Sequence, residues 1–211
     1  LSFVFSSSSY SEETSDILVT IKPLHSLVSG VLGNTGKARL LVTESSSPHD
    51  FQLKPSQIKL LQDANIIFYI DDSFETFLRR VFKTLPKGVK KSAVAKMSRI
   101  TILPFREGGL WEGHDHGEHK DEEHKHGQHK DEEHDDHAEE QNMHIWLDAD
   151  NAKKIVKSIT KELSAIFPEN RNAYKRNAKN YIARLDTLDE ELKASTASAK
   201  DLPFIVFHDA Y

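Results

Sequence analysis

Short apolar runs alternate with helix-like patterns from residue 16 onward, and this alternation leaves few folds open to the chain. NIIFYID at 65–71 is almost continuously apolar, which is typical of a strand buried on both faces of a parallel sheet. Three further strands are predicted at 16–21 (DILVTI), 37–43 (KARLLVT) and 92–103 (SAVAKMSRITIL). Strands that alternate with helices form parallel sheets covered on both sides. We therefore predict an α/β fold, a parallel-sheet lobe with flanking helices.

Helix signals occupy the intervals between these strands. KPLHSLVSGVLG at 22–33 has apolar residues at helical spacing, and Gly33 is a typical helix terminator. Pro55 stands near the start of the pattern SQIKLLQDA, where the first helical turn tolerates proline. FETFLRRVFKTL at 74–85 predicts a third helix. These helices would supply the crossovers that parallel strands require.

Two longer helices are expected after the middle of the chain. Pro168 would end the first, whose apolar face is formed by Ala152, Ile155, Val156, Ile159 and Leu163. The second would run from 170 to 194, about 36 Å, with an apolar stripe of Tyr174, Ala178, Tyr181, Leu185, Leu188 and Leu192. Such a stripe indicates a helix lying along a domain or joining two domains, with a coiled coil as the alternative. DLPFIVF at 201–207 predicts one more strand.

The segment 113–140 differs in composition from everything else. It contains GEHKDEEH at 117–124, repeated as GQHKDEEH at 127–134, and no apolar residue that could anchor it, so we expect a disordered, solvated loop. Its net charge is −9 in a chain of −5, and the mildly basic remainder has no nucleic-acid signature. The segment holds eight of the 12 histidines: His114, His116, His119, His124, His126, His129, His134 and His137.

The chain has no cysteine, so histidine and carboxylate are the strong metal ligands available to it. Its start, LSFVFSSSSYSEETSD, is similar to the end of a secretory signal peptide, with a frayed polar terminus as the alternative. No later segment of the sequence is apolar enough to span a membrane.

Four histidines lie outside the repeat segment. His25 falls in a helix pattern and is expected to be structural or exposed. His49 follows the strand at 37–43, His208 follows the strand at 201–207, and His144 opens the pattern after the repeat segment. Open α/β sheets bind ligands beyond the carboxyl ends of their strands, where these three imidazoles could converge on Zn²⁺. Spacing alone does not decide whether these three histidines form a metal site, because the chain contains no short metal-binding motif.

Three stretches resemble, in order and spacing, the zinc-specific solute-binding proteins of bacterial ABC importers (ZnuA type). They are SSPHDFQLKPSQIKLLQDANIIFYI, NMHIWLDADNAKKI and FIVFHDAY, and the acidic histidine-rich loop between the first two also matches. The resemblance implies a periplasmic protein that captures Zn²⁺ as a monomer and delivers it to a membrane ABC permease, without catalysis. It further implies two α/β lobes joined by a long helix.

By this resemblance the metal ligands are His49, His144 and His208. A histidine rather than a glutamate at 208 favours zinc over manganese. Asp50 and Asp209 could orient the imidazoles as second-shell partners, or could instead cap loops and helices. Pro48 stands where some zinc-specific relatives carry a glutamate, and the sequence stops at Tyr211, early in the second lobe.

These features divide the chain into four parts. Residues 1–15 would be the signal-peptide remnant, 16–168 the metal-binding lobe, 169–198 the linker helix and 199–211 the first strand of a truncated second lobe. The repeat segment 113–140 is interpreted as an accessory zinc reservoir or sensor, or else as a spacer. The alternatives to transport are a histidine-rich metal buffer, a zinc hydrolase with Asp50 or Asp209 as base, and a truncated product with impaired function.

Overall fold

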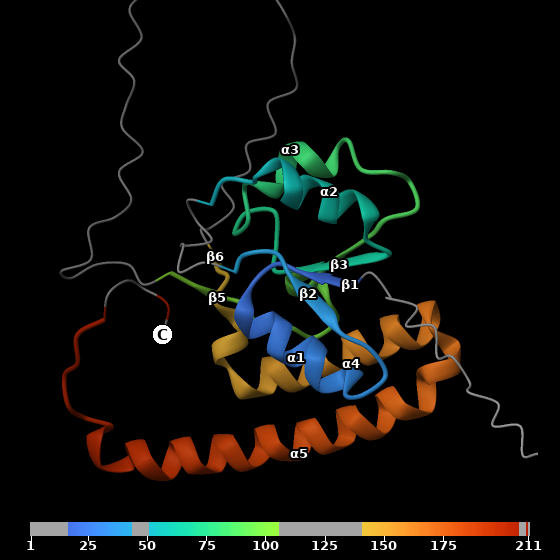
Figure 1. The fold of residues 1–211 in the computed structure, drawn as a ribbon. Helices are drawn as coiled ribbons and strands as arrows, with labels where there is room; N and C mark the ends of the chain where they lie inside the picture. Colours follow the sequence, from blue (N-terminus) through green and yellow to red (C-terminus); the bar gives the residue numbers. More distant parts are fainter. Residues whose placement is uncertain (1–16, 44–50, 106–140, 207–209, 211) are drawn as a thin grey trace, which may run out of the picture.

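The computed structural model describes residues 17–43, 51–105, 141–206 and 210. Its centre is a four-stranded parallel sheet in the order β2-β1-β3-β4 (Figure 1). The strands are β1 (Ile17–Val19), β2 (Ala38–Leu40), β3 (Ile66–Tyr69) and β4 (Lys90–Ala93). The predicted parallel sheet is therefore confirmed. The expected signal-peptide remnant and the repeat segment lie outside the described residues.

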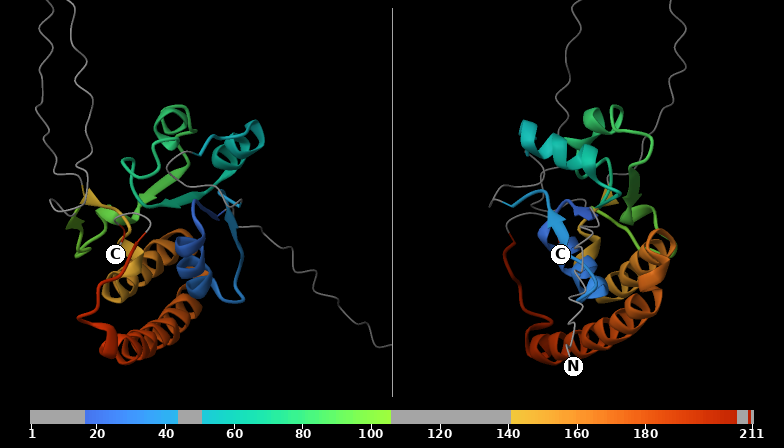
Figure 2. Two further views of the ribbon diagram at one scale, coloured as in Figure 1. Left: turned by 90° about the vertical axis from the view of Figure 1, so that its left-hand side faces the viewer. Right: turned by 45° about the vertical axis from the view of Figure 1, so that its right-hand side comes forward.

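Helices cover both faces of the sheet, as the apolar runs predict (Figure 2). Alternate side chains of β1 and β3 point to opposite faces, so each strand contributes to two cores. One core packs the sheet against α1 (Lys22–Leu32), α4 (Ala149–Ile166) and α5 (Arg171–Thr196). The other packs it against α2 (Pro55–Asp63) and α3 (Leu78–Phe82).

The helix ends follow the local sequence. Pro23 lies in the first turn of α1, and Gly33 ends that helix with a φ of 55°, where its N–H donates to the carbonyl of Ser29 (2.9 Å). Pro55 opens α2 in the same way. Asp148 caps α4 because its carboxylate accepts the N–H of Asn151 (2.6 Å).

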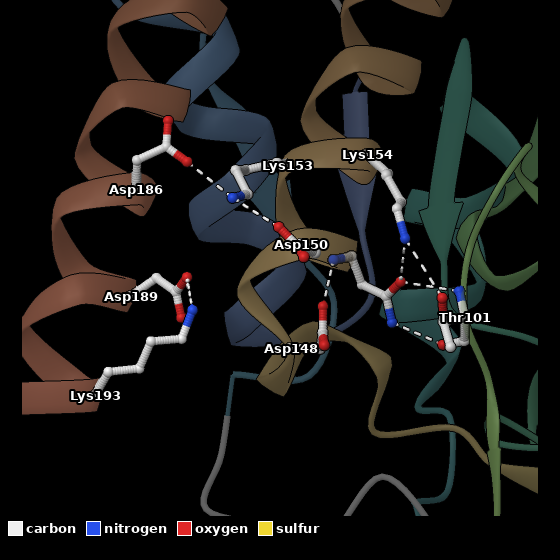
Figure 3. A network of polar contacts seen from close by, with 9 residues as sticks. Thr101, Asp148, Asp150, Lys153, Lys154, Asp186, Asp189 and Lys193 are labelled. Atoms are coloured by element: carbon white, nitrogen blue, oxygen red, sulfur yellow. Dashed lines mark hydrogen bonds and ion pairs between the residues drawn. The ribbon is translucent and has the colours of Figure 1, made fainter. Parts of the chain in front are cut away.

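Helices α4 and α5 form an antiparallel pair that lies under the sheet, with α1 beside them (Figure 1). Lys153 of α4 joins the two helices, since its ammonium lies 2.8 Å from Asp186 of α5 and 2.7 Å from Asp150 one turn away (Figure 3). At the start of α5, Asn177 donates to the carbonyls of Val31 and Leu32 (3.0 and 3.2 Å) and so caps the end of α1. Between Asn177 and Asp186, α5 is thus fastened to both neighbouring helices.

Gly30 allows α1 and α5 to approach closely, and we predict that Gly30→Ala destabilises the chain by about 1–3 kcal/mol. A Cβ at this position would lie 2.3–2.9 Å from three atoms of the Tyr181 ring. In a Tyr181→Ala background the collision is absent, so the same change should stabilise α1 by up to ~1 kcal/mol through helix propensity. Urea unfolding of the four proteins of this cycle measures both values, and an equal effect of Gly30→Ala in both backgrounds would contradict the close contact.

Three predicted elements differ from the structure. The pattern at 92–103 was expected to be one strand, but β4 covers 90–93, a 3₁₀ turn follows at Val94–Lys96, and Arg99 has a φ of 69°. The helix expected at 74–85 is reduced to the five residues of α3. Residues 201–206 of the strand expected at 201–207 carry no strand, and Phe207 lies outside the described residues.

A second, two-stranded antiparallel sheet joins β5 (Leu103–Pro104) to β6 (Gln141–Asn142). A 3₁₀ turn, η2 (Ile145–Leu147), follows β6 and leads into α4. This small sheet brings together the two described stretches on either side of residues 106–140. No helix in the described part of the chain combines the length and apolarity needed to cross a membrane.

Candidate metal centre

The carboxyl ends of the parallel strands meet at one edge of the sheet, the edge where open α/β sheets bind ligands. The chain turns away from β1 toward α1 on one face and away from β3 toward α3 on the other. Thr20 follows β1, and Ile70 and Asp71 follow β3. The two strand ends therefore lead into segments that diverge at this edge.

The carboxyl group of Glu75 ties these two strand ends together. Its Oε2 accepts the N–H groups of Ile70 (2.7 Å) and Asp71 (3.2 Å), and its Oε1 accepts the hydroxyl of Thr20. The side chain is fully buried. Burial raises the pKa of Glu75 to about 7, against the three hydrogen bonds, which favour the ionised form.

Asp71 fixes the start of the stretch Asp71–Phe77, which we call the β3–α3 segment. Its Oδ1 accepts both the N–H and the hydroxyl of Ser73 (2.9 Å each), and Oδ2 lies 3.2 Å from the ammonium of Lys96. Burial acts to raise the pKa of Asp71, but these hydrogen bonds and the Lys96 charge outweigh it, so the pKa is lowered. The ionised carboxylate of Asp71 thus holds the turn at Ser73 through these contacts.

His144 lies against this segment. Its ring packs edge-on to Phe74 (centroids 5.4 Å apart, 86° between planes) and lies 5.3 Å from the ring of Trp146. The Nδ1 atom of His144 is 2.8 Å from Oδ1 of Asn142, and the backbone N–H of His144 donates to the same oxygen (3.1 Å). Two aromatic rings and the contact with Asn142 therefore hold the imidazole.

The β3–α3 segment also contacts Phe51, the first described residue after the gap at 44–50. Phe77 packs edge-on against Phe51 (5.1 Å between centroids), which is buried and lies two residues after His49 in the sequence. Ala210, two residues after His208, is also buried. Phe74 and Phe77 thus bring His144 and the chain just beyond His49 to one short segment.

Comparison with known protein families gives a match that includes all of the described residues. The model of the family "Zinc-uptake complex component A periplasmic" matches residues 17–211. The chain belongs to this family.

Individual relatives agree with the assignment. A high-affinity zinc uptake system protein ZnuA from Brucella abortus is 43% identical over 98% of this chain. A zinc-binding protein AdcA from Streptococcus pyogenes is 33% identical over 92% of it. The fold superposes on the crystal structure of Zn(II)-bound AdcA from Streptococcus pneumoniae with a TM-score of 0.67 and 25% identity, over 92% of this chain. The chain spans 66% of the first relative, 36% of the second and 35% of the solved protein.

Among the residues proposed as ligands, only His144 belongs to the described part of this zinc-uptake family member. His49, His208, Asp50, Asp209 and the eight histidines of the repeat segment fall outside it. Within the described ranges, no three histidine, aspartate or glutamate side chains gather closely enough to hold a metal ion. His25 has a structural role, as expected, because its Nε2 contacts the carbonyl of Ala38 (3.0 Å).

Sequence reasoning missed the β3–α3 segment. It placed Glu75 in an amphipathic helix, where a glutamate is normally exposed, whereas the structure buries it completely. A usable signal is present, since DDSFETF follows the buried strand β3 after Ile70 and so begins at the ligand-binding edge of the sheet. Asn142 belongs to the motif NMHIWLDADNAKKI, but nothing in that motif indicates its contact with the His144 ring.

Proposed function

We propose that this chain captures Zn²⁺ in the periplasm and delivers it to the membrane permease of an ABC importer. Its family membership supports this, as does the zinc named for its relatives and for the solved AdcA structure. The chain acts as a binding protein and catalyses no reaction. It binds the ion as a monomer.

In this proposal His49, His144 and His208 bind the ion through imidazole nitrogens, with Asp50 and Asp209 as outer partners. Neutral imidazoles suit Zn²⁺ and are usually oriented by a second hydrogen bond. One observation carries the assignment: the β3–α3 segment contacts His144 through Phe74 and the chain beside His49 through Phe77. The carboxyl ends of β1 and β3 support that segment through Glu75.

The repeat segment serves as an accessory in this proposal. Its eight histidines and its negative charge attract zinc ions loosely and hand them to the fixed site. Loose binding of this kind weakens below about pH 6.5, where imidazoles become protonated. The rival function is metal buffering, in which the repeat segment is the working part, and the near-identical repeats favour this as the second candidate.

Zinc titration by calorimetry separates these functions. We expect one tight site that remains after deletion of residues 113–140. His144→Ala should weaken that site by more than roughly tenfold, the lower bound for losing even an outer partner of a metal ligand. His25→Gln is the matched control, because it removes a histidine that bonds the carbonyl of Ala38, on another part of the lobe, and it should bind zinc as the parent chain does.

The opposite titration result would support the metal-buffering function. If deletion of residues 113–140 removed all zinc binding, and His144→Ala left the titration unchanged, the repeat segment would be the working part. Hydrolysis of ester substrates by the zinc-loaded chain, lost in the His144→Ala variant, would instead indicate a hydrolase.

A further inference from the structure

The amide of Asn142 has a defined orientation, because it accepts a hydrogen bond from a backbone N–H. The oxygen Oδ1 lies 3.1 Å from the backbone nitrogen of His144, and a backbone N–H can only donate. The atom facing His144 is therefore the amide oxygen and not the NH₂ group. This settles the usual ambiguity between the two ends of an asparagine side chain.

The same oxygen lies 2.8 Å from Nδ1 of His144. Since an amide oxygen can only accept, Nδ1 must carry a proton and donate it. A neutral imidazole has one N–H, so its lone pair is then on Nε2. The contact thus selects one of the two tautomers of His144.

The residues around His144 hold its ring in place, so that Nδ1 and not Nε2 faces Asn142. The rings of Phe74, His144 and Trp146 pack pairwise, with centroids 5.3–5.5 Å apart. Asn142 is itself held in β6, where it pairs with Leu103 of β5. His144 is also fixed through its backbone, because its carbonyl accepts the N–H of Leu147 (3.1 Å), the last residue of η2.

We propose that Asn142 is a positioning residue that makes Nε2 of His144 the zinc-binding nitrogen. This inference rests on the proposed function, in which His144 is a ligand. It adds the identity of the donor atom and the residue that selects it. A metal ligand whose second nitrogen donates to a fixed acceptor gains both orientation and basicity. The acceptor here is a neutral amide, which strengthens the imidazole less than a carboxylate would.

Two variants test the proposal against a matched control. Asn142→Leu keeps the approximate volume but removes the acceptor, so we expect both tautomers of His144 to be populated and zinc affinity to fall roughly 10–100-fold. Asn142→Asp keeps an acceptor in place and should retain the Nδ1–H tautomer and at least the parent affinity. Gln141→Leu alters the exposed neighbour in the same strand and should leave both properties unchanged.

The first measurement is long-range ¹H–¹⁵N NMR of the metal-free chain at about pH 8, where ordinary imidazoles are neutral. His144→Ala identifies the His144 signals by their loss. We expect a protonated Nδ1 and an unprotonated Nε2 in the parent chain, and zinc titration by calorimetry then gives the affinities. Urea unfolding of each variant separates a local effect from a loss of folded protein.

The outcomes distinguish this inference from the proposed function. A proton on Nε2 of His144 in the metal-free parent would overturn the role of Asn142 while leaving zinc capture intact. So would parent-like zinc affinity in folded Asn142→Leu. Unchanged zinc binding by His144→Ala would remove the proposed function and this inference together.

Discussion

Replacing Glu75 with glutamine is expected to remove most of a pH dependence of stability that the parent chain shows between about pH 4.5 and 7. In the parent, the free energy of unfolding should fall by roughly 3 kcal/mol over this range because of Glu75 alone. The pKa of this carboxyl is raised from 4.5 to about 7 in the folded chain. The folded state therefore binds the proton more tightly than the unfolded state, and raising the pH destabilises it.

The structure explains why glutamine should be tolerated. Its amide oxygen can accept the N–H groups of Ile70 and Asp71, and its NH₂ group can face the hydroxyl of Thr20. It carries no charge, so no deprotonation has to occur in the buried site. Asp71 works in the opposite direction, because its pKa is lowered, and its contribution is lost only on acidification below about pH 4.

Urea unfolding of the metal-free proteins from pH 4.5 to 8 measures this effect as the difference between the parent and Glu75→Gln. The histidines titrate in the same range but are common to both proteins. Glu190→Gln is the control, since it makes the same replacement at an exposed site on α5, away from the buried carboxyl. Parallel profiles for the parent and Glu75→Gln would show that folding does not raise the pKa of Glu75.

A second large effect is expected for Asn151→Ala, a loss of roughly 2–3 kcal/mol of stability. Asn151 is almost completely buried. Its Oδ1 accepts the N–H of Thr101 (2.9 Å) and its Nδ2 donates to the carbonyl of Thr101 (2.7 Å), as a neighbouring strand would. Alanine removes both bonds and releases the stretch before β5 from the first turn of α4. Figure 3 shows Thr101 beside that turn, with Lys154 reaching toward it.

Asn151→Asp provides a sharper comparison because it keeps the acceptor and replaces the donor NH₂ by a charged oxygen. The carboxylate can still accept the N–H of Thr101 but places a second oxygen against the carbonyl of Thr101, so we expect it to be no more stable than Asn151→Ala. Asn180→Ala, at an exposed site on α5, should be neutral or slightly stabilising. Urea unfolding at pH 7 gives all three values, and a change below about 0.5 kcal/mol for Asn151→Ala would mean that water replaces both bonds.

The sequence predicts the helices of this lobe well where the local signals are strong. Gly33 ends α1 and Pro55 opens α2 as expected, and the apolar faces of α4 and α5 have a clear helical period. β4 was misplaced because it lies at the edge of the sheet. Lys90 and Lys91 are exposed there, so the strand lacks the apolar signature of a buried one.

The candidate site was predictable only in part, for a physical reason. The residue type and the family motif both indicate His144 as a metal ligand. Its surroundings, however, come from residues distant in sequence, such as Phe74. The apolar periodicity of residues 74–85 also gives no sign that α3 is shortened to five residues. Glu75 turns inward to the N–H groups of Ile70 and Asp71, and the chain follows turns rather than helix up to Phe77. Tertiary hydrogen bonding thus overrides local helical preference here.

Helix α5 contacts α1 closely where Tyr181 meets Gly30, and it extends well beyond this contact. Beyond Asp186, which pairs with Lys153, the helix continues to Thr196, about 15 Å further. Leu188 and Leu192 on that stretch are about half exposed. A small tilt of α5 where Tyr181 meets Gly30 is therefore magnified at the far end. We therefore expect a methyl group added at Gly30 to displace the end of α5 near Thr196 more than the contact itself.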